Sequence, residues 1–163
     1  MVRRALPSLV FLSLFLVACI GSKEAAVVSY VEKVQSIGER MAENGTKFEV
    51  LMDTQEDPLV WSDEEKAEIS KTIDALEELQ SEAAAMSVPE PFMAIHPLLT
   101  QSIGEMVAAV TVIRDITVDP TLATLEQAQE MTANAENGEK LSTQFVEQLE
   151  AILNAQYPEM MKE

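Results

Sequence analysis

The sequence predicts an all-α protein: an antiparallel up-down four-helix bundle that follows a cleaved signal peptide. Two observations support this fold class. Apolar residues recur at steps of three and four along four segments, which is the period of a helix, and no stretch alternates long enough to form a strand. Proline-rich or helix-capping sequences separate these segments by short connections, which favours antiparallel neighbours. We therefore expect one bundle domain over residues 23–157, with a C-terminal tail at 158–163.

The N-terminus has the pattern of a secretory signal. Arg3 and Arg4 form a positive region, and Ala5 to Ala18 is an uncharged, mostly apolar run. A run of this length is too short to cross a bilayer comfortably as a helix of about 20 residues. We expect residues 1–18 to be the signal peptide, cleaved between Ala18 and Cys19, with residues 19–22 as a short tether.

The end of this run together with the next residue, Leu16-Val17-Ala18-Cys19, resembles the lipobox of bacterial lipoproteins. The resemblance implies that Cys19 carries a covalent diacylglycerol and becomes the first residue of the mature chain; no other cofactor is expected. The alternative is an ordinary signal peptide, or an uncleaved anchor, with an incidental cysteine. Cys19 is the only cysteine, so no internal disulfide can form.

The lipobox resemblance also implies a location. Two acyl chains anchor a protein stably where one holds only marginally, so the protein would be attached to a membrane outside the cytoplasm, in the cell envelope. Gly21 follows Cys19 by two positions and is not the aspartate that favours inner-membrane retention in enterobacterial lipoproteins. In a Gram-negative cell the resemblance therefore favours the periplasmic face of the outer membrane.

The charge of the chain excludes one class of partner. The sequence holds 11 basic and 28 acidic residues, a formal net charge of −17, and removal of Arg3 and Arg4 with the signal changes it to −17 − 2 = −19. Such a surface repels nucleic acid and anionic headgroups. We expect no nucleic-acid partner, a membrane contact through the lipid, and a protein partner at the cell envelope.

The first two helical segments lie on either side of a loop at residues 52–61. Ser22 is the expected cap of the first, whose apolar face is Val27, Val31, Val34, Ile37, Met41, Phe48 and Leu51. Ser62 and Glu65 have the spacing of a capping box, so a second helix should begin there. Its predicted face is Ile69, Ile73, Leu76, Leu79, Ala83 and Met86.

The third and fourth segments follow proline-containing breaks. Pro89 and Pro91 interrupt the chain, and the next face is Phe92, Ile95, Leu99, Ile103, Met106, Val110 and Ile113. Pro97 should kink this helix or mark its true start, with His96 as a capping residue. Asp119 and Pro120 predict the start of the fourth helix, with the face Leu125, Ala128, Met131, Ala135, Gly138, Ser142, Phe145, Leu149 and Ile152.

A short motif occurs twice, as AENGTKF at residues 42–48 and AENGEKL at 135–141. Asn-Gly usually marks a turn, but the apolar stripe keeps its phase through both copies, so we expect both to lie inside helices with glycine on a buried seam. The flanking apolar positions do not align, which argues against duplication. In an up-down bundle whose fourth helix begins at Pro120 the two glycines would be offset by about 16 Å along the axis, so we expect them not to meet.

Few residues suggest chemistry. His96 is the only histidine, which removes two-histidine metal sites and most hydrolytic arrangements. No metal site is expected, and the alternative is a site formed by Met86, Met93 and His96, since thioether and imidazole ligands suit Cu(I) and Met/His ligation suits haem. Against this, methionines usually fill gaps in cores, and His96 can simply border the helix. We therefore expect no catalytic residues.

Trp61, the only tryptophan, follows Val60 in the loop before the second helix. It should either cover the end of the bundle or, with Val60, form an exposed docking patch for a partner. The stretch VPEPFMAIHPLL, residues 88–99, resembles uncharacterised helical-bundle lipoproteins of bacteria, which implies a fold rather than an activity. The sequence thus predicts a membrane-anchored, non-enzymatic interaction or structural module; the alternative is a periplasmic copper- or haem-binding bundle that uses Met93 and His96.

Overall fold

A computed structural model describes residues 22–54 and 60–161 and shows an all-helical fold. Its four helices are α1 (Ser22–Thr54), α2 (Asp63–Ala84), α3 (His96–Val118) and α4 (Leu125–Gln156). Short 3-10 turns lie at Glu90–Phe92 (η1), Pro120–Leu122 (η2) and Pro158–Met161 (η3), and no strand occurs in the described ranges. The all-α fold class is confirmed.

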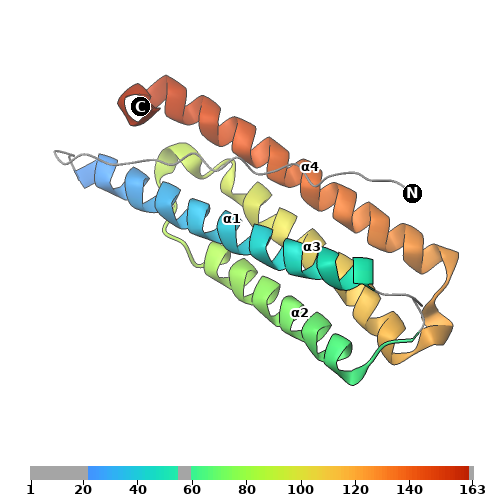
Figure 1. Cartoon of the computed structure of the whole chain (residues 1–163). Coiled ribbons are helices and arrows are strands. Elements are labelled where there is room, and N and C mark those ends of the chain that lie inside the picture. The colour runs from blue at the N-terminus through green and yellow to red at the C-terminus, as the bar shows by residue number, and fades with distance from the viewer. Residues whose placement is uncertain (1–21, 55–59, 162–163) are drawn as a thin grey trace.

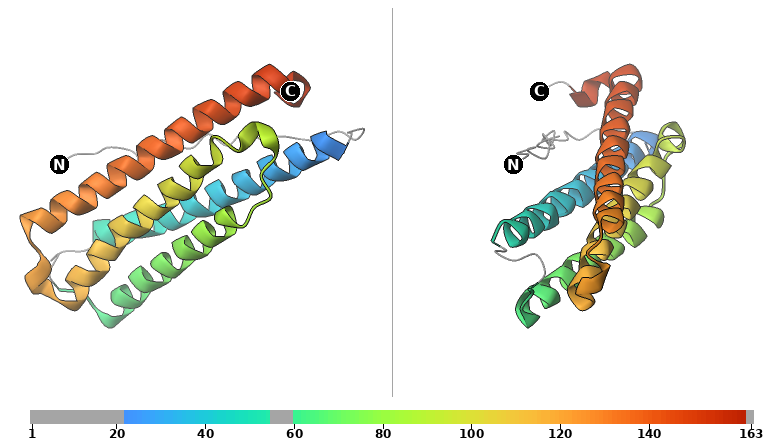
Figure 2. Two further views of the ribbon diagram at one scale, coloured as in Figure 1. Left: turned by 180° about the vertical axis from the view of Figure 1, so that it is seen from behind. Right: turned by 90° about the vertical axis from the view of Figure 1, so that its right-hand side faces the viewer.

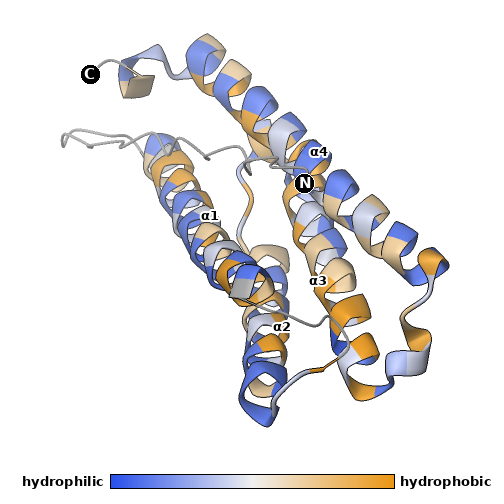
Figure 3. Ribbon diagram, turned by 45° about the vertical axis from the view of Figure 1, so that its right-hand side comes forward, coloured by the Kyte–Doolittle hydropathy of each residue, from blue (hydrophilic) through white to orange (hydrophobic). Residues whose placement is uncertain are grey.

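The four helices lie side by side, and α3 is the central one (Figures 1 and 2). The helix pairs in closest backbone contact are α3 with α4, α2 with α3, and α1 with α2. Helix α3 can occupy this position because Glu105, Arg114 and Asp115 are its only charged residues. In Figure 3 apolar colour accordingly extends along much of α3, whereas the outer helices alternate between polar and apolar faces. A helix that is apolar on several sides must be covered on several sides.

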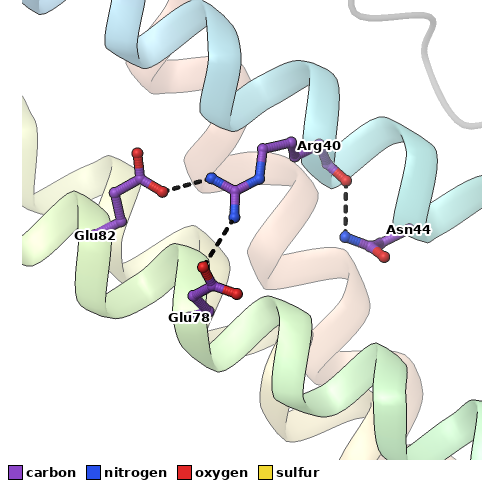
Figure 4. A network of polar contacts seen from close by, with 4 residues as sticks. All are labelled: Arg40, Asn44, Glu78 and Glu82. Atoms are coloured by element: carbon purple, nitrogen blue, oxygen red, sulfur yellow. Dashed lines mark hydrogen bonds and ion pairs between the residues drawn. The ribbon is translucent and has the colours of Figure 1, made fainter.

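Helix α1 runs without interruption through Asn44 and Gly45, as predicted. The Asn44 amide donates to the carbonyl of Arg40 at 2.9 Å, and the Thr46 hydroxyl donates to the carbonyl of Ala42 at 2.9 Å, so these side chains are satisfied within the helix. The Arg40 guanidinium pairs with Glu78 and Glu82 and thereby links α1 to α2 (Figure 4). Ser22, the expected cap, is the first described residue and is already helical.

Helix α2 begins as the capping box predicted. The Ser62 hydroxyl accepts the backbone N–H of Glu65, and the Glu65 carboxylate accepts the backbone N–H of Ser62 at 2.7 Å. These bonds hold the pKa of the Glu65 carboxyl below its usual value, because they favour the charged form. Every residue of the predicted inner face of this segment, from Ile69 to Met86, is buried.

Helix α3 begins later than its predicted apolar face. Phe92 is buried but belongs to η1, and Ile95 takes the N-cap position, so His96 is the first helical residue rather than a cap. Pro97 therefore marks the helix start and does not kink the helix interior, where its missing N–H would break a hydrogen bond. The break at residues 87–91 is confirmed, since no α-helix covers it.

The predicted start of the fourth helix at Pro120 is wrong. Asp119 caps only the short turn η2, accepting the N–H of Thr121 at 3.0 Å, and Ala123 then has the non-helical backbone angles φ −70° and ψ 68°. The chain must therefore begin a helix again, and it does so at Leu125 with the Thr124 hydroxyl as cap. The sequence signal was real but belonged to a 3-10 turn.

The predicted face of α4 is fully buried at none of its positions before Gly138. Gly138, Phe145 and Leu149 are buried as expected, together with Leu153. Leu125, Ala128 and Ala135 are exposed, and among the described residues α3 is the only α-helix in close backbone contact with α4. The segment predicted as a C-terminal tail is partly ordered: Pro158–Met161 forms η3, and Met160 and Met161 pack against the core.

Candidate functional site

One end of the helical assembly is closed by a buried polar and aromatic cluster. The Tyr30 hydroxyl lies 3.1 Å from His96 Nδ1, and His96 Nε2 lies 3.0 Å from the carbonyl oxygen of Ala83. A carbonyl can only accept, so in the neutral ring Nε2 carries the proton and Nδ1 accepts from Tyr30. The Tyr30 ring also stacks on Phe92, with 4.8 Å between ring centroids. This cluster joins α1, α2, η1 and α3.

These contacts bear on the Met86, Met93 and His96 candidate site. Both ring nitrogens of His96 already have partners, and a metal would have to break one of the two bonds. Met86 is buried in the core, whereas the Met93 side chain is 61% exposed, so the two thioethers have quite different surroundings. Among the described residues no group of three or more His, Cys, Asp or Glu could hold a metal ion. The geometry favours a structural role for His96.

The two docking candidates, Trp61 and Val60, have different surroundings. Trp61 is only 9% exposed and belongs to the hydrophobic core, whereas Val60 is 66% exposed. The docking interpretation is therefore wrong for Trp61, whose apolar ring gains more by covering the interior than by facing water. The other candidates, Ala18 and Cys19, lie outside the described residues.

A groove lies toward the other end of the assembly, where α1 ends and α4 begins (Figure 1). Its volume is about 370 Å³, and all four helices contribute to its lining. We call it the α1–α4 groove, because these two helices supply most of its residues. Its larger apolar side chains are Met41, Phe48, Leu76, Met106, Val110 and Met131.

The sequence creates this groove by placing small residues where a bundle would normally have large ones. Gly45, Ala109 and Ala135 all line it. A Cβ built at Gly45 would meet nothing within 4 Å, so open space lies beside α1 at this point. Since α1 packs mainly on α2 and α4 packs mainly on α3, the space between α1 and α4 stays open. The right-hand view of Figure 2 shows the ribbons of α1 and α4 apart from each other near the end of α1.

Residues of both repeated motifs border the same groove, although the two glycines do not meet, as predicted. Asn44 and Gly45 line it from α1, and Ala135 and Glu136 line it from α4. The predicted axial offset of about 16 Å was too large, because α4 begins at Leu125 rather than Pro120 and α1 extends to Thr54. Measured from those ends, Gly45 and Gly138 differ by four residues in depth, about 6 Å along a helix.

The glycines themselves have different surroundings. A Cβ at Gly138 would lie 3.2 Å from the Ser102 carbonyl oxygen and 3.3 Å from Met106 Cγ, so this glycine permits close packing of α4 on α3 as predicted. Gly45 does not have this role, because no neighbour approaches it. The expectation of a buried seam is therefore right for Gly138 and wrong for Gly45.

The rim of the groove is acidic. Glu49, Glu136 and Glu139 stand at its border, and none of them forms an ion pair with another described residue. The Thr72 and Thr132 hydroxyls donate to the carbonyls of Glu68 and Ala128, at 3.0 and 2.8 Å. The polar groups of the lining that can still bind a ligand are therefore mainly hydrogen-bond acceptors. No groove was predicted at this place, and the only sequence feature associated with it is the repeated motif, whose Asn44, Gly45, Ala135 and Glu136 border it.

Two further findings complete the description. No helix in the described part of the chain is both long and apolar enough to cross a membrane. Comparison with known proteins found no matching family, and no curated protein or solved structure showed significant similarity to the chain.

Proposed function

We propose that the protein is a membrane-anchored extracytoplasmic lipoprotein whose helical domain is a non-enzymatic interaction or structural module. One observation carries the proposal: the stretch Leu16-Val17-Ala18-Cys19 ends an apolar run that follows Arg3 and Arg4. In this proposal residues 1–18 are removed and Cys19 carries the diacylglycerol. The protein then belongs to the cell envelope, on the periplasmic face of the outer membrane in a Gram-negative cell.

The geometry of α1 fits an anchored domain. Ser22 begins the helix three residues after Cys19, a tether of only about 10 Å at about 3.5 Å per residue. The groove residues Met41 to Glu49 lie 19 to 27 residues further along α1, about 30–40 Å at 1.5 Å per residue. With the helices in an up-down antiparallel order, the acidic groove would stand away from the membrane, where a soluble ligand or protein partner could reach it.

The non-enzymatic part of the proposal is supported by the roles of the reactive side chains. His96 and Tyr30 are bonded to each other within the core, and the Ser62 hydroxyl caps a helix. The second candidate, copper or haem binding through Met93 and His96, has less support because both His96 nitrogens are engaged and Met93 faces solvent. Titration with Cu(I) separates the two: tight binding by the full chain that His96→Ala abolishes would favour the second candidate.

The anchor is tested by metabolic labelling with palmitate in the producing cell. We expect the wild-type chain to take up the label and to fractionate with membranes, and Cys19→Ser to lose both the label and the cleavage. Ser22→Ala, just beyond the lipobox, is the matched control and should keep the label. An unlabelled wild-type chain, or a Cys19→Ser chain that is still labelled, would refute the assignment.

A further inference from the structure

The α1–α4 groove has no role in anchoring, and its lining lies entirely within the described residues. A conclusion about its ligand therefore does not depend on whether Cys19 is lipidated. The groove's volume of about 370 Å³ is at the small end of the range of about 300–1,000 Å³ that is typical of small-molecule sites. Size alone thus indicates a small ligand rather than a folded partner.

The walls specify an apolar body for that ligand. Met41, Met106 and Met131 reach the groove from three different helices, and Phe48 adds an aromatic ring. Thioether side chains are flexible and polarisable, so they adapt to apolar ligands of varied shape. An alkyl or aryl group placed here would be removed from water on several sides, which is the main favourable contribution to such binding.

The rim specifies the charge of the ligand. Glu49, Glu136 and Glu139 bring three carboxylates to one opening, and none of them forms an ion pair with a described residue. An anionic ligand would be repelled, and a neutral one would gain no attraction from the carboxylates. A cationic group at the rim would gain ion pairs and could lie near the Phe48 ring, where a cation–π contact is favourable.

We infer that the α1–α4 groove is a binding site for a small amphiphilic cation, with its apolar body among the methionines and its ammonium group at the Glu49, Glu136 and Glu139 rim. The ligand class is that of an amine or quaternary ammonium attached to an alkyl or aryl group. Both copies of the repeated motif contribute to the site, through Asn44 and Gly45 on α1 and through Ala135 and Glu136 on α4.

The probe for this site is octyltrimethylammonium, with octyl sulfate as the same chain carrying the opposite charge. The full chain, held in discs of zwitterionic lipid, is labelled with ¹³C at its methionine methyl groups and titrated by NMR. We expect saturable shifts of the Met41, Met106 and Met131 signals and none at the exposed Met93, which does not line the groove. Equal shifts with octyl sulfate, or no shift at the three groove methionines, would overturn the inference.

A filled groove provides a test that does not weaken the fold. Gly45→Leu introduces a side chain into open space and replaces the poorest non-proline helix former by a good one. We expect the variant to keep its helical circular dichroism and to bind octyltrimethylammonium at least about tenfold more weakly. Binding as tight as that of the wild-type chain would show that the cation lies elsewhere.

Two matched triple variants distinguish attraction of the cation by the rim carboxylates from attraction by the overall negative charge of the chain. Glutamine at positions 49, 136 and 139 removes the rim carboxylates, and glutamine at Glu32, Glu147 and Glu150 removes three exposed carboxylates that do not line the groove. We expect about tenfold weaker binding for the first variant, since exposed ion pairs contribute a factor of about two to five each, and near wild-type binding for the second. Equal weakening in both would mean non-specific attraction and would refute the site.

Discussion

At the scale of single residues, the same dipeptide has two different structural roles. Asn44-Gly45 and Asn137-Gly138 both lie inside α-helices with no positive φ angle, so neither glycine is needed for its backbone conformation. What distinguishes them is the neighbour: α3 lies against Gly138, whereas Gly45 borders the groove. The local sequence is nearly identical, so the difference arises only from packing.

This difference predicts opposite outcomes for alanine at the two positions. Gly45→Ala should raise the free energy of unfolding by about 1 kcal/mol, since alanine is the better helix former and its Cβ has room. Gly138→Ala should not raise the free energy of unfolding in this way. The new Cβ would lie 3.2 Å from a backbone oxygen that cannot move independently of α3. Urea denaturation of both variants measures this. A Gly138→Ala chain as stable as Gly45→Ala would contradict the packing role.

Tyr30 predicts a pH dependence of stability. Burial raises the pKa of the Tyr30 phenol well above its usual value of 10.0, because the phenolate is poorly solvated there. Because the pKa of Tyr30 is higher in the folded than in the unfolded chain, protonated Tyr30 adds to the free energy of unfolding. This contribution is fully present below pH 10 and is lost as the pH rises beyond it. We expect the stability of the wild-type chain to fall more steeply above pH 10 than that of Tyr30→Phe. Thermal unfolding at a series of pH values gives the two slopes.

The Tyr30→Phe chain should also be less stable at neutral pH. Removing the hydroxyl leaves the Nδ1 atom of buried His96 without its partner, at a cost of about 1–3 kcal/mol. This lower stability at neutral pH does not affect the comparison of how steeply the two chains lose stability above pH 10. Parallel pH profiles for the two chains would show that Tyr30 does not remain protonated in the fold.

At the scale of elements, α2 and α4 begin after capping side chains and α3 does not, and not every capping sequence began an α-helix. Ser62 with Glu65 begins α2, where two reciprocal bonds satisfy free N–H groups. Asp119 has an equally good capping geometry but begins only η2. The backbone at Ala123 departs from helical angles after it, so a second cap, Thr124, is required.

The capping box predicts a local effect on stability. Ser62→Ala should lower the free energy of unfolding by about 1 kcal/mol, since an unsatisfied N–H remains at the start of α2. Ser70→Ala, at an exposed position inside the same helix, is the matched control and should be neutral or slightly stabilising. Chemical denaturation of the two variants measures the difference, and equal stabilities would mean that the cap is energetically unimportant.

At the scale of the whole molecule, the dominant feature is an excess of negative charge. The formal net charge is −17, and the ion pairs of the described residues are partly or largely solvent-exposed. Exposed pairs contribute little each, so they do not offset the repulsion among the remaining carboxylates. An acidic chain of this kind remains soluble at some cost in stability.

Salt should therefore stabilise the fold. Raising the ionic strength from 0.01 to 0.1 M shortens the Debye length from about 30 to about 10 Å, which screens repulsion across the molecule. We expect Tm to rise by about 2–4 °C for each kcal/mol of repulsion removed. Calorimetry in NaCl and in KCl provides the measurement, with equal shifts in both salts excluding a cation-specific site. A Tm that falls with salt would mean that the ion pairs outweigh the repulsion.

The sequence by itself determined the helices, because their causes are local. The period of three and four residues, the Ser62 capping box and the proline break before α3 each act within a few neighbouring residues. It also placed nearly all of the core correctly on α2 and α3, where the inward faces are covered along their length.

Only the tertiary structure decided where the molecule is open. The distance between α1 and α4 depends on how each helix packs on a different neighbour, and no local pattern encodes it. Because α4 begins at Leu125 and not at Pro120, its residues lie about 8 Å nearer to the start of the helix than predicted. Residues of both repeated motifs therefore border one groove. Leu125, Ala128 and Ala135 belong to the apolar stripe of α4 but are exposed. An apolar stripe is buried only where another element comes close enough to cover it.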